Sequence, residues 1–403
     1  MNAISKNFRG KRDIAFYVVA LLITTHVSLF YGFPDEVKIG AGLLLIILFL
    51  FIGSAQSLLL AISLALFTLV LNIGIHATGL EQSLYYRPHE ILKFHLPDFG
   101  GVYKPNTQFS MHQPFGDIQA TENIGIMEPH EITYQTDGIG FRNPSDYHGQ
   151  QLVLVGDSFI AGVTDTQSCI VTEWLRREHQ LDTYNLGHPG DMEEYVTRIK
   201  AFRKRYGDNF HALLFVFEGN DFNSPYTGKG EPRHGLFKRY TKAFRHTSVW
   251  RYTHSLYLRS IKSRSNEVGA KVKVIGGQPV GFYKQDLAAV GNYTPLMENH
   301  LHFVAALQEI KPVVTQIFFI PTKYRVYGQW ISPAPLPNEQ WNYLAAAAKQ
   351  VGIPIYDLTP ALQAEAARLL PQKQYVFWRD DTHWNCNGMR VAANEVVHVL
   401  NLR

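Results

Sequence analysis

The 403-residue sequence has very little cysteine, with only Cys169 and Cys386. Two cysteines are too few for a disulfide-rich scaffold or a cysteine-rich zinc site. The chain also lacks an HExxH pattern or any comparable spacing of ligands, so we predict no metal site. Its formal net charge is only +4, which gives no reason to expect nucleic acid as a partner.

Charged residues are absent from much of the N-terminal part. Residues 14–33 contain no Asp, Glu, Lys or Arg, and none occurs between Lys38 and Glu81. A membrane helix needs about 20 mainly apolar residues. The two runs therefore predict an N-terminal membrane anchor in residues 1–80, with transmembrane helices at about 14–33, 38–54 and 57–77.

Positive charge ahead of the first span sets the expected orientation. Lys6, Arg9, Lys11 and Arg12 all precede residue 14, and positive residues stay on the cytoplasmic side. Three passes would place the chain after about residue 80 on the other side of the inner membrane, facing the periplasm or the exterior. A single crossing within residues 38–77 would invert this orientation.

The rest of the chain predicts an α/β fold. Residues 81–150 are rich in Pro, Gly, Tyr and His and lack a long helical period, so we interpret them as a linker that packs onto the C-terminal domain. Residues 151–403 alternate apolar strands with amphipathic helices, which predicts a parallel sheet covered by helices on both faces, a three-layer α/β/α arrangement. An insertion at about 222–310 interrupts this rhythm. The predicted strands are 151–156, 182–187, 211–217, 314–321 and 353–358.

Polar residues come directly after the first three of these strands. Ser158 comes after the first strand in Gly-Asp-Ser, Gly190 after the second in NLGHPGD, and Asn220 after the third in Gly-Asn-Asp. A fourth block, WRDDTHWN at 378–385, precedes the last predicted helix. In parallel sheets, chemistry collects at the carboxyl ends of the strands. We therefore expect these four blocks to form one site.

The four blocks supply the groups needed for acyl transfer. Such chemistry uses a hydroxyl nucleophile, a base and a carboxylate that orients the base, together with backbone or amide donors for the oxyanion. In this order the blocks resemble the SGNH branch of the GDSL hydrolase superfamily. The resemblance covers about 130–220 and 310–400 and includes the TDGIGFRN lead-in at 136–143. It implies a flavodoxin-like fold and catalysis without a metal or an organic cofactor.

The resemblance also assigns roles to residues. Ser158 would be the nucleophile and His383 the base, and the oxyanion would be held by the backbone N–H groups of Ser158 and Gly190 and by the Asn220 amide. The usual spacing of the family selects Asp380 as the acid. The polysaccharide O-acetylation relatives use Asp-x-His-Trp, which selects Asp381; we favour Asp381 and expect the other carboxylate to face solvent.

A Pro-x-Lys-x-x-x-Tyr segment at 321–327 also resembles those O-acetylation relatives. It makes Lys323 and Tyr327 candidate substrate contacts, with ordinary surface packing at a helix N-terminus as the alternative. The basic, aromatic stretch at 229–264 could lie on an anionic membrane, hold an acidic polymer, form a lid or be a solvated helical excursion. For Cys169 and Cys386 we expect two separate buried thiols rather than a disulfide.

Together these features predict a membrane-anchored extracytoplasmic serine esterase or O-acyltransferase. Its substrate would be a small ester or an acyl ester, most simply acetyl, of a cell-envelope glycan or exopolysaccharide. A transferase would take its acyl group from a separate multi-span membrane protein, and the lipid bilayer would be a further partner. The alternative is a non-catalytic envelope or polysaccharide assembly subunit that retains the SGNH fold.

Overall fold

The computed structural model describes residues 54–80, 85–222, 226–228, 247–260, 272–283, 297–332 and 336–402. Its contacts divide the chain into two compact units. The first consists of residues 1–85 and 233–262, and the second of residues 86–232 and 263–403.

In the first unit, α3 (Ser54–Thr78) packs against α10 (Ser248–Ser260). The Val249 N–H donates a hydrogen bond of 3.2 Å to the Asn72 side chain. The third expected membrane span, 57–77, lies within α3, whereas the first two lie outside the described residues apart from Ser54. Among the helices that the structure describes, none is both long and apolar enough to cross a membrane.

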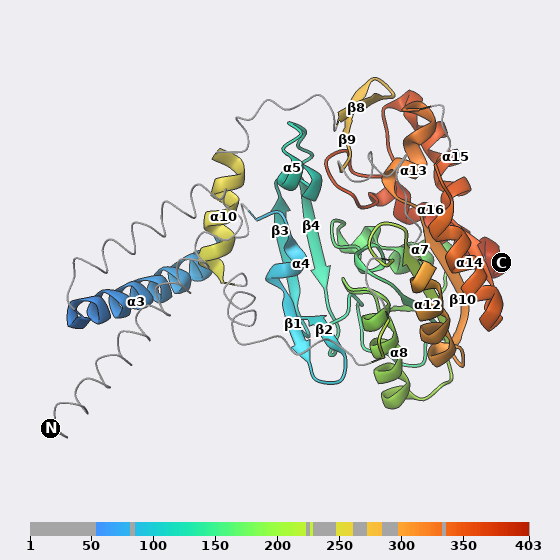
Figure 1. The fold of residues 1–403 in the computed structure, drawn as a ribbon, viewed down its shortest axis with the longest axis horizontal. Coiled ribbons are helices and arrows are strands. Elements are labelled where there is room, and N and C mark those ends of the chain that lie inside the picture. The colour runs from blue at the N-terminus through green and yellow to red at the C-terminus, as the bar shows by residue number, and fades with distance from the viewer. Residues whose placement is uncertain are drawn as a thin grey trace. The chain divides into compact units, whose positions relative to one another are not determined.

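The second unit is built on a five-stranded sheet. Figure 1 labels one of its strands, β10, and several of the helices that accompany it. All strand pairs are parallel, and the spatial order is β11-β10-β7-β5-β6. This is the order 2-1-3-4-5 that flavodoxin has, so the predicted α/β fold with a parallel sheet is confirmed. The strands are β5 (Leu152–Val155), β6 (Thr183–Asn185), β7 (His211–Phe217), β10 (Val314–Ile320) and β11 (Ile355–Asp357).

Alternating side chains on the strands form two apolar layers. On β7, Leu214 and Val216 belong to one buried cluster, and Leu213 and Phe215 to the other. The first cluster includes residues of α8, α12 and α14, and the second residues of α7, α15 and α16, so helices cover both faces of the sheet. These helices are α7 (Val171–His179), α8 (Met192–Tyr206), α12 (Met297–Ile310), α14 (Glu339–Val351), α15 (Thr359–Leu369) and α16 (Cys386–Val399).

Part of the predicted insertion at 222–310 belongs to these layers. Its last described element is α12, which packs against α8 and α14. Before it comes a hairpin of β8 (Val272–Ile275) and β9 (Gln278–Gly281), which are antiparallel. The remaining short helices are α6 (Ser158–Ala161), α13 (Lys323–Tyr327), η1 (Gln167–Cys169), η3 (Gly328–Trp330) and η4 (Leu370–Gln372).

The segment predicted as a linker at 81–150 contains secondary structure of its own. It forms two antiparallel hairpins, β1-β2 and β3-β4, with short helices beside them. Its elements are α4 (Pro88–Ile91), β1 (Lys93–Leu96), β2 (Gly100–Tyr103), β3 (Gln108–Gln113), α5 (Asp117–Glu122) and β4 (His130–Gln135). From residue 86 on it belongs to the same compact unit as the sheet, and it supplies part of the candidate site.

Candidate active site

Ser158 lies at the carboxyl end of β5, where the strand passes into α6. The turn needs glycine at position 156, because a Cβ there would come within 2.7 Å of Ile160 and 3.2 Å of Phe215. Asp157 then caps α6 by accepting the Phe159 N–H at 2.9 Å. The strand end, the close turn and the cap together place the Ser158 hydroxyl at the edge of the sheet, half-buried.

His383 comes within hydrogen-bond range of Ser158, although the two residues are 225 positions apart. Its Nε2 is 2.8 Å from Ser158 Oγ, and its Nδ1 is 2.6 Å from Asp381 Oδ1. The same carboxylate oxygen accepts the His383 backbone N–H at 2.9 Å. The arrangement is a hydroxyl, an imidazole and a carboxylate in series, which is the geometry that acyl transfer by a serine requires.

The electrostatics of this chain favour a charged His383–Asp381 pair. Burial would lower the pKa of His383, but the attraction of Asp381 and its hydrogen bond outweigh burial and raise that pKa to about 9. Burial would raise the pKa of Asp381, but His383 and the backbone N–H groups hold it well below its usual range. The site therefore stabilises the imidazolium that forms when His383 takes a proton.

Asp381 is the carboxylate that contacts His383, so Asp380 is the one that we expected to face solvent. The prediction that it faces solvent was wrong, because its side chain is buried. One carboxylate oxygen accepts the backbone N–H groups of Gly116 at 2.8 Å and Glu128 at 2.9 Å. The other oxygen is buried without a hydrogen-bond partner among the described residues. Burial raises the pKa of Asp380 to about 7. Its two hydrogen bonds to backbone N–H groups anchor the loop to the segment before the sheet.

The same segment contributes Asp117, which sequence reasoning missed. The Asp117 N–H donates to Asp381 Oδ2 at 2.7 Å, and its carboxylate accepts both the N–H (2.9 Å) and the hydroxyl (2.8 Å) of Thr382. Gly116 permits this close approach, because a Cβ there would lie 2.5 Å from the Asp380 carbonyl oxygen. Burial and the charge of Asp381 raise the pKa of Asp117. Asp117 thus holds Thr382, the residue between the acid Asp381 and the base His383.

Lys323 and Tyr327 hydrogen-bond to the backbone of the segment at 376–381 and do not line an open site. Both side chains are buried, so the predicted substrate contacts and the alternative of surface packing both disagree with the structure. The Lys323 ammonium donates to the carbonyls of Trp378 (2.7 Å), Arg379 (3.0 Å) and Asp381 (3.1 Å). The Tyr327 hydroxyl accepts the Val376 N–H at 3.0 Å. Both residues act on the loop backbone that carries Asp381 and His383.

The two remaining predicted oxyanion donors come after the strands that flank β5. Gly190 is partly exposed in the loop after β6, and Asn220 is exposed in the turn after β7. Their edge of the sheet is the expected one, and their role as donors stays a prediction. The loop of Gly190 is fixed by the buried Arg198, which donates to the carbonyls of His188 (2.8 Å) and Pro189 (3.0 Å).

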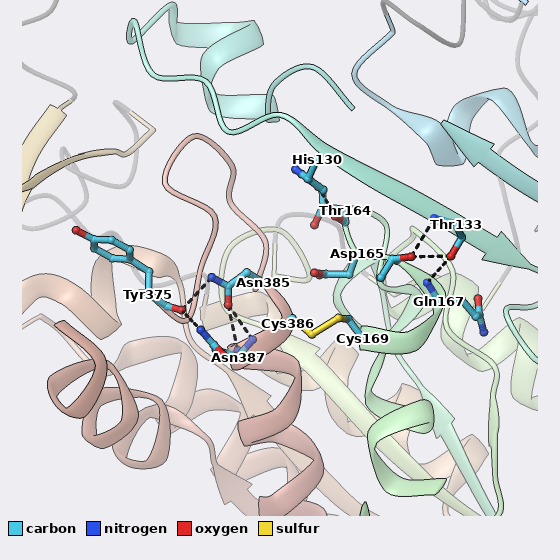
Figure 2. Close-up of a disulfide and its surroundings, with 12 residues drawn as sticks. His130, Thr133, Thr164, Asp165, Gln167, Cys169, Tyr375, Asn385, Cys386 and Asn387 are labelled. Atoms are coloured by element: carbon cyan, nitrogen blue, oxygen red, sulfur yellow. Dashed lines mark hydrogen bonds between the residues drawn. A yellow bond between two sulfur atoms is a disulfide. The ribbon is translucent and has the colours of Figure 1, made fainter. Parts of the chain in front are cut away.

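Cys169 and Cys386 form a disulfide (Figure 2). The expectation of two separate thiols was wrong, because their Cα atoms lie only 5.0 Å apart across 217 positions of sequence. The bond joins η1 to the first residue of α16. Asn385 caps α16 by accepting the Asn387 N–H at 3.0 Å and donates to the Tyr375 carbonyl at 2.9 Å. Cap and disulfide together fix the end of the loop just after His383.

Within the part of the chain that the structure describes, one group has metal-ligating atoms close together. Ligand atoms of Asp117, Asp381 and His383 lie within 4.8 Å of one another. Both ring nitrogens of His383 already face hydrogen-bond partners, Asp381 and Ser158. We therefore assign this group to acid–base chemistry.

Comparisons with known proteins place the C-terminal part of this chain in a family context. Residues 292–403 match the family model described as "SGNH hydrolase-like domain, acetyltransferase AlgX". A probable alginate O-acetylase AlgJ of Pseudomonas putida is 25% identical over 134 residues, which are 32% of this chain and 34% of that protein. The matched region thus spans about a third of that relative. These matches confirm the resemblance to SGNH hydrolases and support an SGNH-type ester hydrolase or acyltransferase.

Similar solved structures include a lipolytic protein of the G-D-S-L family from Veillonella parvula, with 12% identity and a TM-score of 0.34. That match covers 62% of this chain and 97% of the other. A mutant of Axe2, an acetyl-xylooligosaccharide esterase from Geobacillus, has 14% identity and a TM-score of 0.34 and covers 64% and 97% of the two chains.

Proposed function

We propose that this protein is a serine esterase or O-acyltransferase that acts on an acyl ester, most simply acetyl, of a cell-envelope glycan or exopolysaccharide. The observation that carries the proposal is the series Ser158–His383–Asp381, with contacts of 2.8 Å and 2.6 Å. A non-catalytic subunit would have no need for a half-buried hydroxyl held against an imidazole whose far nitrogen meets a carboxylate.

The reaction proceeds in two halves. His383 Nε2 takes the proton of Ser158 as Oγ attacks the ester carbonyl, and the oxyanion accepts hydrogen bonds from the Ser158 and Gly190 N–H groups and the Asn220 amide. When the carbonyl re-forms, the C–O bond to the alcohol breaks and His383 returns its proton to the leaving oxygen. Water or a sugar hydroxyl then attacks the acyl-serine with His383 again as base, the acyl bond to Ser158 Oγ breaks, and His383 returns the proton to Oγ. Asp381 stabilises the imidazolium in both halves.

The glycan assignment is supported by the names of the similar proteins, an alginate O-acetylase and an acetyltransferase domain. Water as the second acceptor makes the protein an esterase, and a sugar hydroxyl makes it a transferase. A transferase that takes its acyl group from inside the cell needs a separate multi-span membrane protein as its donor. Neither route requires a metal or an organic cofactor.

The proposed location is the outer side of the inner membrane, with the N-terminal region as a multi-pass anchor. The charge-free runs at 14–33 and 39–80 support the anchor, and so do exposed apolar side chains on α3, among them Phe67 and Val70. The Cys169–Cys386 bond fits an oxidising compartment. A reporter that works only in the cytoplasm, fused after Arg403, should be silent, and a strong signal would contradict this orientation.

A fluorophosphonate probe tests the enzymatic function. We expect the purified full-length protein to be labelled covalently, Ser158→Ala to remain unlabelled, and His383→Ala to be labelled far more slowly. Thermal melting of each variant shows whether it is folded. If the folded wild type takes no label and turns over no acetyl ester, the enzyme is refuted and the assembly-subunit alternative replaces it.

A further inference from the structure

A cavity of about 360 Å³ lies at the carboxyl ends of β10 and β11, outside the Ser158 site. Its walls include Phe319 of β10, Asp357 of β11 and the first residues of α14 and α15. Neither the acid–base series nor Lys323 and Tyr327, which support its loop, line the cavity. A cavity of this size at the reactive edge of a parallel sheet is a candidate for ligand binding.

The lining combines an aromatic surface with polar groups that have bonding capacity left. Trp341 and Phe319 pack edge to face with ring centroids 5.6 Å apart. Asp357 uses Oδ1 to accept the Thr359 N–H at 2.8 Å, and Oδ2 makes no hydrogen bond to a described residue. Gln363 donates to the Arg325 carbonyl at 3.0 Å, which leaves its side-chain oxygen to accept.

This combination suits a sugar ring. A pyranose has an apolar C–H face that packs on an aromatic ring and a rim of hydroxyls that donate and accept hydrogen bonds. Asp357 and Gln363 are only half-buried, so Asp357 Oδ2 and the side-chain oxygen of Gln363 can accept hydrogen bonds from an occupant of the cavity. The hydroxyls of a sugar would supply those donors.

The charge of the lining selects the kind of sugar. Arg325 is the only cation among the described residues that line the cavity. Its guanidinium is paired with the buried Glu218 and also donates to Asn338 Oδ1 at 2.7 Å and to the Pro337 carbonyl at 2.6 Å. Its charge is therefore compensated, whereas Asp357 has no cationic partner among the described lining residues. A uronic acid would meet a carboxylate there without a counter-charge, so the lining fits a neutral sugar.

The position along the sheet relates the cavity to the proposed reaction. Ser158 follows strand β5, which is separated from β10 by β7, and β11 lies one strand beyond β10. Neighbouring strands are about 4.8 Å apart, so the cavity lies roughly 10–15 Å along the same edge. The ester bound at Ser158 cannot also fill the cavity, but another unit of the same oligosaccharide can reach it.

We propose that this cavity is a binding subsite for a neutral sugar unit of the glycan whose acyl ester reacts at Ser158. This inference rests on the proposed function, since it takes the substrate to be a glycan. It adds that the polymer is uncharged where it is held and that recognition extends beyond the acylated sugar.

The first experiment measures binding without turnover. The full-length Ser158→Ala protein is titrated calorimetrically with neutral hexasaccharides of the cello, xylo, manno and gluco series and with an alginate hexasaccharide. We expect at least one neutral oligosaccharide to bind, alginate to bind more weakly, and Trp341→Ala or Gln363→Leu in this background to weaken binding about tenfold. Binding by no neutral member, or binding that neither substitution changes, overturns the proposal.

The second experiment separates the subsite from the chemistry. In the otherwise unaltered enzyme, Trp341→Ala should lower kcat/KM for the O-acetylated form of the bound oligosaccharide about tenfold through KM and leave 4-nitrophenyl acetate within about twofold. Trp174→Ala on α7, which belongs to the other apolar layer, is the matched control and should not distinguish the two substrates. Equal loss on both substrates in Trp341→Ala refutes the subsite, whereas lack of any turnover by the wild type refutes the proposed function and leaves the binding result standing.

Discussion

Replacing Asp381 by Asn should abolish most of the activity, whereas replacing its neighbour Asp380 by Asn should not. Asp381 accepts from both the ring and the backbone of His383, and it is the main reason that the pKa of His383 rises from 6.5 to about 9. That difference corresponds to about 3 kcal/mol in favour of the imidazolium, or roughly 300-fold in rate if all of it is lost in the transition state. An amide can also fix the wrong tautomer of the histidine, a defect that costs about 10⁴-fold in the Ser-His-Asp template.

The assay is the rate of serine labelling and of 4-nitrophenyl acetate turnover. For Asp381→Asn we expect a fall between about 300-fold and 10⁴-fold with KM little changed. Asp380→Asn is the matched control, because its amide oxygen can still accept the N–H groups of Gly116 and Glu128. It should keep activity within about threefold. Comparable losses in both variants, or the larger loss in Asp380→Asn, would refute the assignment of the acid.

Asp380→Asn also tests the linkage between protonation and stability. The pKa of Asp380 is raised from 3.8 to about 7, so the native state holds this proton more tightly than the unfolded chain. The associated stability is present below pH 3.8 and is lost as the pH rises through 7, by up to about 4 kcal/mol. Chemical denaturation should therefore show that Asp380→Asn is more stable than the wild type at about pH 8 but not at about pH 4. Equal effects at both pH values would contradict the burial argument.

The remaining predictions concern the base, its supports and the disulfide. Because His383 must be neutral to accept a proton and its pKa is raised to about 9, labelling should increase with pH up to about 9, and a plateau already reached at about pH 7 would contradict this. Asp117 helps to raise that pKa, so Asp117→Asn should move the midpoint of the pH profile downwards, not merely lower the melting temperature. Lys323→Met leaves three carbonyls without their donor, and it should lower the free energy of unfolding by about 3 kcal/mol or more and slow labelling. The double variant Cys169→Ser, Cys386→Ser should lose about 2–5 kcal/mol of stability, and alkylation of the denatured wild type should require prior reduction.

The elements and residues that could be predicted from the sequence are those with a local signature. The longer strands of the sheet are apolar runs, as in the predicted 211–217, which coincides with β7, whereas β6 is Thr-Tyr-Asn. Ser158 and His383 could be found because each lies in a short contiguous block beside a strand or helix end. Asp381 could be favoured over Asp380 only through a resemblance, because both spacings before the histidine are plausible on sequence alone.

The parts that sequence reasoning missed depend on contacts between distant segments. Asp117 meets its partners across about 265 positions and through backbone N–H groups, which every residue but proline has. Lys323 was a candidate substrate contact because its Pro-x-Lys-x-x-x-Tyr segment resembles the O-acetylation relatives, and only the fold shows its ammonium buried against three carbonyls. The Cys169–Cys386 pairing needed a distance, which sequence separation does not provide.

The dependence of the loop at 378–385 on residues 116–128 has a practical consequence for anyone who trims this protein for expression. A fragment that starts at residue 150 retains every residue of the four family blocks and would pass as a complete catalytic module. It would nevertheless lose the N–H groups of Gly116, Asp117 and Glu128 that hold the two carboxylates, and expose a buried acid that was anchored by them. Inactivity of such a fragment would reveal a missing support rather than a missing nucleophile, so cloning boundaries should be set upstream of residue 86.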